Sequence, residues 1–117
     1  MNYKLELDVK ATESPVVFNT ILLDSFKVNI VERYTTGAKP KLCEVLFKVR
    51  TLDDKLFKKK DGNINTYMRG EGFVAYQTYK NVLSSPYYRK KLINTKQAEQ
   101  DFVHFILSSV ILNYDLM

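Results

Sequence analysis

The sequence contains few of the residues from which disulfides, metal sites and histidine-based active sites are built. Its 117 residues include a single cysteine, a single histidine and no tryptophan. With Cys43 alone, the chain cannot form an intramolecular disulfide or a zinc site made of several cysteines. With His104 alone, a metal site with several histidine ligands is almost excluded. We therefore expect no metal and no cofactor, and a protein of the reducing cytoplasm.

Long apolar runs are also missing. No stretch approaches the ~18 uninterrupted apolar residues of a transmembrane helix. Residues 1–8 alternate apolar and charged side chains, whereas a secretory signal has a basic start and then a continuous apolar run. Hydrophobic residues make up 45% of the chain and aromatic residues 13%, which is enough for a packed core. We expect one domain over residues 1–117.

Acidic residues are fewer than basic ones. The chain has 18 Lys and Arg against 13 Asp and Glu, which gives a formal net charge of +5. A positive balance favours a polyanionic partner such as nucleic acid, although many soluble domains carry a similar charge.

Apolar residues recur with a period of two in the first half of the chain, which indicates strands. The pattern covers residues 3–10 and residues 42–50, where Cys43 falls in the apolar row with Val45, Phe47 and Val49. Cys43 is therefore expected to be a small core residue. Residues 16–34 are also strand-like, but Val31 disturbs their alternation, so a bulge or bend is expected there.

A hairpin is predicted at Asp61-Gly62, because a tight turn between two strands needs positive φ at its centre. The flanking strand-like runs are residues 55–60 and 63–68. Lysines lie at the tip, so we expect the hairpin to project from the body.

The last third of the chain favours helices. Residues 73–79 fit a strand or a helix equally well, and Ser85-Pro86 is typical of a start for a short basic helix over 87–93. Asn94 or Thr95 can cap a final helix that runs to about Asn113. This helix is apolar on two sides, so it is either central or meets another subunit. Strands first and helices last predict an α+β fold or a β-barrel with added helices.

Catalysis is poorly supported, and we expect a protein that is not an enzyme. Cys43 and His104 are the residue types of a nucleophile-base pair, but we do not expect such a pair because Cys43 falls in a core row. The acidic neighbours Asp53-Asp54 and Asp61 are explained by turn chemistry. Gly70-Glu71-Gly72 lacks the rest of a phosphate-binding loop.

Basic and aromatic residues lie beside one another at several places in the sequence. A protein that binds single strands needs cations for the phosphates and exposed rings on which bases stack. A lysine run at a turn also keeps an edge strand soluble, and most tyrosines pack at a core edge, so each residue has a structural alternative. The predicted DNA-binding residues are Arg33, Tyr34, Lys48, Arg50, Phe57, Lys58, Lys59, Lys60, Tyr67, Arg69, Tyr87, Tyr88, Arg89 and Lys90.

The successive antiparallel strands and the basic hairpin resemble the OB-fold of single-stranded-DNA-binding proteins. The whole chain resembles the short single-stranded-DNA-binding proteins of lactococcal phages. The stretches that carry the resemblance are MNYKLELDVKATESPVVFNTILLDSFKVNIVERY and LFKKKDGNINTYMRGEGF.

This resemblance implies a mainly β, α+β fold: a five-stranded OB-like Greek-key barrel with C-terminal helical elements. It also implies a protein that coats single-stranded DNA during phage replication and recombination, in the cytoplasm of an infected host cell. Self-assembly is implied as well, and so is work alongside a recombinase or a single-strand annealing protein. Because tryptophan is absent, stacking would fall to tyrosine and phenylalanine.

Two alternatives stay open. The doubly apolar final helix suits a small phage protein that binds and modulates a host protein. Tyr87, Tyr88, Arg89 and Lys90 supply the residue types of a metal-independent ribonuclease of the small toxin type.

Overall fold

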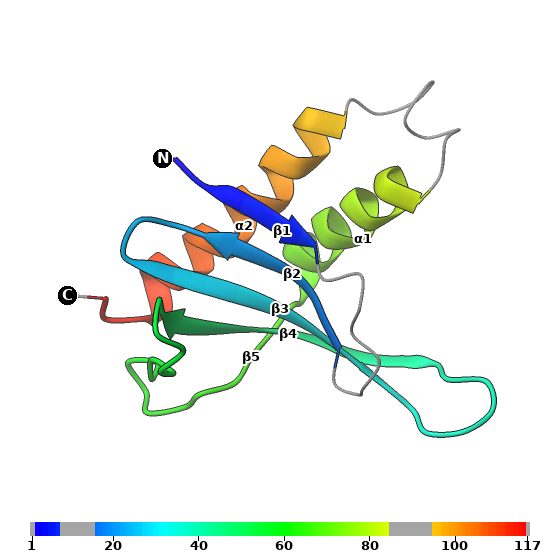
Figure 1. The fold of residues 1–117 in the computed structure, drawn as a ribbon, viewed down its shortest axis with the longest axis horizontal. Coiled ribbons are helices and arrows are strands. Elements are labelled where there is room, and N and C mark those ends of the chain that lie inside the picture. The colour runs from blue at the N-terminus through cyan, green and yellow to red at the C-terminus, as the bar shows by residue number, and fades with distance from the viewer. Residues whose placement is uncertain (1, 8–15, 85–94, 117) are drawn as a thin grey trace. The chain divides into compact units, whose positions relative to one another are not determined.

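A computed structural model of the chain describes residues 2–7, 16–84 and 95–116 (Figure 1). Within these residues the fold is mixed α+β and mostly sheet, with the strands first and the helices last, which confirms the predicted class. The elements are β1 (Lys4–Leu7), β2 (Val16–Leu22), β3 (Phe26–Tyr34), β4 (Leu42–Thr51), β5 (Thr66–Tyr67), α1 (Gly70–Ser84) and α2 (Thr95–Asn113).

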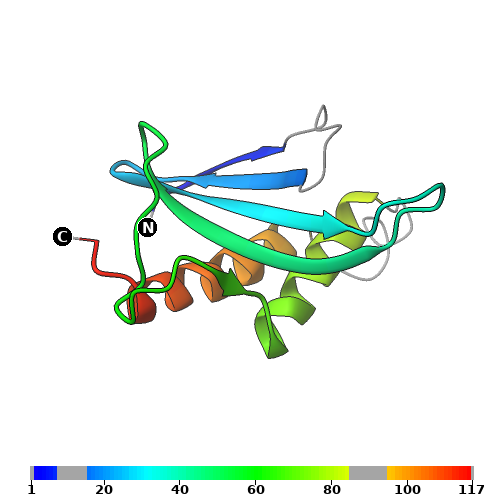
Figure 2. The ribbon, with the colours of Figure 1, turned by 90° about the horizontal axis from the view of Figure 1, so that it is seen from below.

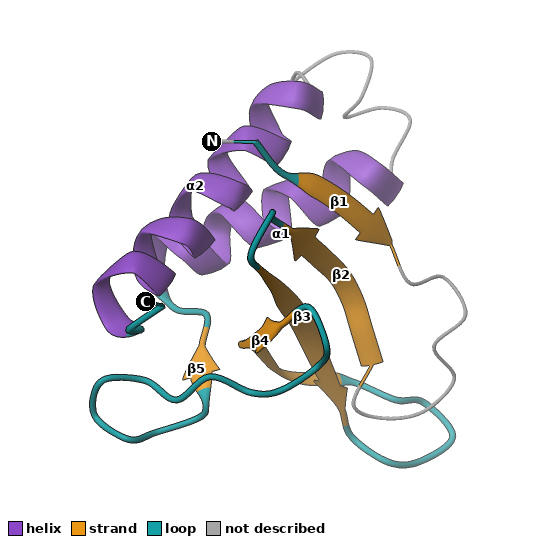
Figure 3. Cartoon of the chain, turned by 60° about the vertical axis from the view of Figure 1, so that its left-hand side comes forward, coloured by secondary structure: helices purple, strands orange, loops and turns teal. Residues whose placement is uncertain are grey.

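The five strands form one antiparallel sheet in the order β1-β2-β3-β4-β5. Each strand pairs with the next one along the chain, so the sheet is a meander (Figure 3). Among the described residues it stays open, with β1 and β5 at its edges, and the predicted closed Greek-key barrel is not confirmed. Closure needs edge strands long enough to pair with each other, and β5 has only 2 residues.

The two faces of the sheet differ in character, as the period of two predicts. One face carries Ile21, Val28, Ile30, Phe47 and Val49, each at most 2% exposed. The prediction that Cys43 continues this row into the core is wrong, because its side chain is exposed. Cys43 lies at the start of β4, beside the exposed loop 35–41, and burial of the row begins only at Val45.

The disturbance expected at Val31 is present, but it belongs to the neighbouring strand. Val17 pairs with Val31 and Asn19 pairs with Ile30, so β2 bulges at Phe18, while β3 keeps its register with β4 from Phe26 to Arg33. Around this bulge, the consecutive residues 30–32 of β3 are all buried, whereas a regular two-faced strand would expose every second one.

Two turns of the same design follow β4. In the first, the Asp54 N–H donates to the Thr51 carbonyl (3.0 Å) and the Thr51 N–H to the Lys55 carbonyl (2.8 Å). In the second, the Gly62 N–H donates to the Lys59 carbonyl and the Lys59 N–H to the Asn63 carbonyl, both at 2.8 Å. The left-handed position of each turn is filled by Asp54 (φ 72°) and by Gly62 (φ 85°).

The turn predicted at Asp61-Gly62 is therefore present, but the two flanking runs do not pair with each other as the strands of a hairpin. The second run contains β5, which pairs with β4. Lys59 forms a bridge with Tyr114, and the Lys60 N–H donates to the Asn113 carbonyl at 2.8 Å. Apart from the Lys59–Asn63 hydrogen bond of the turn itself, the backbone before the turn thus pairs with residues 113 and 114.

The chain divides into two compact units, Met1–Tyr67 with Asn113–Met117, and Met68–Leu112. In the second unit, residues 73–79 prove to be helical, as part of α1, and α2 has the predicted bounds.

The predicted helix 87–93 lies outside the described residues. The apolar side chains Tyr76, Tyr79 and Phe102 are buried and in ring contact. Neither α1 nor α2 is long and apolar enough to cross a membrane.

Candidate nucleic-acid interface

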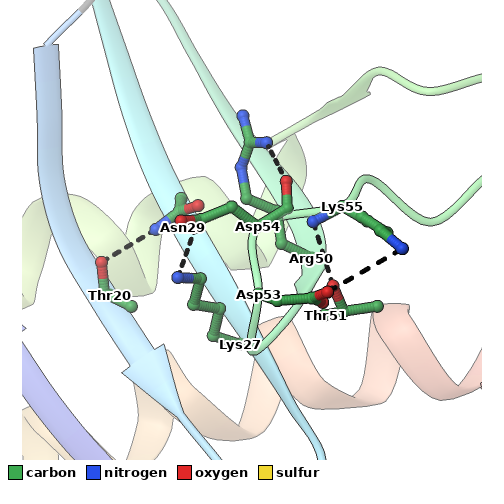
Figure 4. Close-up of polar contacts among 8 residues, drawn as sticks. All are labelled: Thr20, Lys27, Asn29, Arg50, Thr51, Asp53, Asp54 and Lys55. Carbon is green, nitrogen blue, oxygen red and sulfur yellow. Dashed lines mark hydrogen bonds and ion pairs between the residues drawn. The ribbon is translucent and has the colours of Figure 1, made fainter.

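Five polar side chains lie on the sheet face opposite the Ile21–Val49 row. Residues that pair directly in an antiparallel ladder project to the same side. Thr20 pairs with Asn29, Asn29 with Lys48, and Lys27 with Arg50. We call this group the polar sheet face: Thr20, Lys27, Asn29, Lys48 and Arg50. All five are partly exposed, and Asn29 Nδ2 donates to Thr20 Oγ1 at 2.9 Å (Figure 4).

Two of its three cations are held by the turn that follows β4. Lys27 Nζ forms an ion pair with the Asp54 carboxylate, and Arg50 Nη1 donates to the Asp54 carbonyl oxygen at 3.1 Å (Figure 4). The hydrogen bond from Lys27, then its charge, and to a smaller extent the charge of Arg50, lower the pKa of the Asp54 carboxyl group. The carboxylate is thus a ready anionic partner for Lys27 at neutral pH.

The remaining acidic residues of the loops have turn roles, as predicted. Asp53 accepts a hydrogen bond from the Thr51 hydroxyl and lies 3.9 Å from Lys55 Nζ. Asp61 accepts the Asn63 N–H at 2.9 Å. No group of three His, Cys, Asp or Glu in the described part of the chain could hold a metal ion.

Lys48 is the third cation of the polar sheet face. Within residues 2–7, 16–84 and 95–116 its side chain has no hydrogen-bonding or ionic partner. One row further along the ladder, Leu46 pairs with Tyr67, which places the Tyr67 ring on the same face. Tyr67 is 37% exposed. The face therefore combines cations with an accessible aromatic ring.

Of the residues predicted from sequence, Arg33 and Tyr34 end on opposite faces. Arg33 has the parity of the polar sheet face, and its guanidinium lies 3.3 Å from the Glu44 carboxylate. Tyr34 lies on the other face, where its hydroxyl donates to the buried Glu32 at 2.9 Å. Tyr34 therefore does not join the cations.

The predicted residues of the loop after β4 include exposed lysines and one lysine that is mostly covered. Lys58 and Lys60 are exposed, whereas the Lys59 side chain is only 18% exposed and lies 3.7 Å from Asp61. Phe57 is partly exposed, and its N–H donates to the Val49 carbonyl at 2.9 Å. This loop thus offers two exposed cations next to a ring.

The remaining predicted residues lie in the second unit or outside the described residues. Arg69 belongs to the second unit, where its carbonyl accepts the Phe73 N–H at the start of α1 (3.4 Å). Gly70, with φ 58°, begins that helix, in keeping with a turn glycine. Tyr87, Tyr88, Arg89 and Lys90 lie outside the described residues. His104 is exposed and contacts Phe105 edge-on, with 5.6 Å between ring centroids.

Four residues of the site were not singled out from sequence: Thr20, Lys27, Asn29 and Asp54. A usable pattern existed for two of them. Lys27 and Asn29 alternate with Val28 and Ile30 in the same way that Lys48 and Arg50 alternate with buried residues of the next strand. Only the register between β3 and β4 shows that these residues lie side by side.

Comparisons with protein-family models, with curated proteins and with solved structures found no match for this chain.

Proposed function

We propose that the protein binds single-stranded DNA without sequence preference and has no catalytic step. The observation that carries the proposal is the set of three cations, Lys27, Lys48 and Arg50, on one face of two paired strands. Cations held in such a track bind phosphates of any sequence.

The ring of Tyr67 supports a single strand rather than a duplex. A base can stack on an exposed ring only when it is not already stacked within a helix, and every base has a face that can do so. Tyr67 on the polar sheet face and Phe57 beside the loop lysines are two rings of this unit that reach solvent. The amide of Asn29 and the hydroxyl of Thr20 add hydrogen-bonding groups between the cations.

The resemblance to the phage proteins extends this proposal. It supports a role in phage DNA replication and recombination, with self-assembly and with a recombinase or annealing protein as partner. It also supports interpreting the open sheet as a variant of the OB architecture, in which one sheet face binds oligonucleotides.

A fluorescence-anisotropy titration with labelled oligo-dT of about 20 nucleotides tests the proposal, since one site covers ~4–16 nucleotides. The double variant Lys48→Gln/Arg50→Gln should bind more weakly than the wild type. Its plot of log K against log salt should be less steep by about 1.4, because two phosphate contacts are lost. Duplex DNA as competitor should displace the oligonucleotide poorly.

The matched control is Lys39→Gln/Lys41→Gln, which removes the same charge from the exposed loop between β3 and β4. That loop lies at the far end of the β3–β4 ladder from Arg50 (Figure 2). We expect this control to keep most of the affinity. The proposal fails if oligo-dT does not bind at about 50 mM salt, or binds with no salt dependence.

A second candidate function is binding of a protein partner through α2. Ile111 and Leu112 near its end are 58% and 73% exposed, and large exposed apolar side chains side by side are typical of contact surfaces. Absence of oligo-dT binding at low salt would favour this candidate.

A further inference from the structure

The Asp54 carboxylate occupies the position that an anionic ligand of the polar sheet face would take. It forms an ion pair with Lys27 of β3, and its own backbone carbonyl accepts a hydrogen bond from Arg50 of β4. The two cations are direct partners in the strand ladder. One acidic residue therefore engages two neighbouring cations, one through its side chain and one through its backbone.

The backbone at Asp54 shows that an acidic side chain is not needed to make the turn. The Lys59–Asn63 turn has the same hydrogen bonds and fills the same left-handed position with Gly62. Glycine is the residue that this conformation favours, although Asp and Asn tolerate it better than other side chains. The turn therefore does not require the Asp54 carboxylate, which forms an ion pair with Lys27.

Exposure differs sharply between the two members of the ion pair. The Asp54 side chain is 73% exposed, whereas the Lys27 side chain is 19% exposed. The Lys27 side chain is therefore mostly covered by its neighbours, while the Asp54 side chain lies mostly in solvent. A half-buried cation that loses its partner needs another anion.

We propose that Lys27 and Arg50 form a phosphate-binding subsite, which Asp54 occupies in the free protein and which a phosphodiester group of the bound strand takes over. The inference rests on the proposed function, because it assigns the ligand of two of its cations. In this arrangement Asp54 competes with DNA phosphates and so lowers the affinity for DNA. It also makes the plot of log K against log salt less steep, because fewer cations neutralise phosphates.

The test compares Asp54→Asn with Asp53→Asn in the oligo-dT titration. Both variants remove one negative charge from the same turn, but Asp53 interacts with Thr51 and Lys55 and not with the cations of the polar sheet face in the described part of the chain. Asn suits the left-handed backbone, so the Asp54→Asn turn should be kept. We expect Asp54→Asn to bind more tightly than wild type, with a salt plot steeper by about 0.7 from one added phosphate contact. Its advantage over the wild type should then grow about 2.5-fold between about 200 and 50 mM salt.

Lys27→Gln supplies the second measurement. If Asp54 acts through Lys27, Asp54→Asn should no longer steepen the salt plot in the Lys27→Gln background. The inference is overturned if Asp54→Asn and Asp53→Asn behave alike, or if Asp54→Asn gains affinity equally with and without Lys27. The proposed function survives that result as long as the wild type binds. If neither the wild type nor any variant binds oligo-dT, the proposed function itself is wrong.

Discussion

Tyr114 ties the end of the chain to the sheet. Its hydroxyl lies 2.8 Å from the Thr66 hydroxyl of β5, and both residues are buried. Burial raises the pKa of the Tyr114 phenol above its ordinary value of 10.0, the hydrogen bond with Thr66 acts in the opposite direction, and the charge of Asp61 raises the pKa further. The folded protein therefore favours the neutral phenol.

Tyr114→Phe should lower the free energy of unfolding by about 1 kcal/mol at pH 7, because the buried Thr66 hydroxyl loses its partner. Because the folded-state pKa of Tyr114 is raised, the wild type should lose stability as the pH rises above 10 through that pKa. The variant has no phenol to ionise, so the difference between the two proteins should shrink. Urea denaturation at pH 7 and above pH 10 measures both effects, and a constant difference would contradict this account.

Cys43 illustrates a limit of local pattern at the residue scale. Its position in an alternating row predicts a place in the apolar row of β4. The register shifts at this point, however, because Arg33 pairs with Glu44 and Tyr34 with Leu42, so that the ladder skips Cys43. Burial begins at Val45, two residues further along, and the thiol lies exposed at 3.5 Å from the Lys41 carbonyl. The extent of a core depends on what packs over it, and that is a tertiary property.

At the scale of elements, the ring of Phe102 in α2 contacts two rings of α1. Phe102 is 1% exposed and stacks on Tyr79, with 5.0 Å between ring centroids. It also meets Tyr76 edge-on at 5.9 Å. Tyr76, Tyr79 and Val82 are buried with a spacing of three, which fits one face of a helix with 3.6 residues per turn. The sequence of residues 73–79 had left strand and helix undecided.

Phe102→Ala should lower the free energy of unfolding by about 3–5 kcal/mol, because it removes a fully buried ring and leaves a cavity. Ile111→Ala on the same helix is the control, since Ile111 is 58% exposed. The control should change stability by no more than about 0.5 kcal/mol. Chemical denaturation followed by circular dichroism gives both values, and equal losses would show that the ring cluster does not stabilise the helices.

At the scale of the whole molecule, the excess of positive charge is not spread evenly over the first unit. Lys27, Lys48 and Arg50 share one sheet face, and Lys58 and Lys60 follow on the loop after β4. A charge placed on the track of a bound strand should count more than an equal charge elsewhere, because only it releases counterions on binding.

Lys58→Ala/Lys60→Ala should weaken oligo-dT binding and make the salt plot less steep by up to about 1.4. Lys59→Ala alone should have a smaller effect, because Lys59 is mostly covered and lies near Asp61. Lys39→Ala/Lys41→Ala again controls for net charge. Equal losses in the two double variants would mean that the loop lysines act only through the total charge of the protein.

The sequence by itself determined the features that depend on near neighbours along the chain. The alternation in residues 47–50, the turn at Asp61-Gly62 and the bounds of α2 were all predictable, because period and turn chemistry are local properties. The partners across the fold were not. The β3–β4 register places Lys27 beside Arg50, and the turn after β4 places the Asp54 carboxylate next to Lys27. The Lys60 N–H donates to the carbonyl of Asn113, whereas the sequence predicted a partner within residues 63–68. These pairings depend on hydrogen bonds between distant segments, and only the tertiary structure decided them.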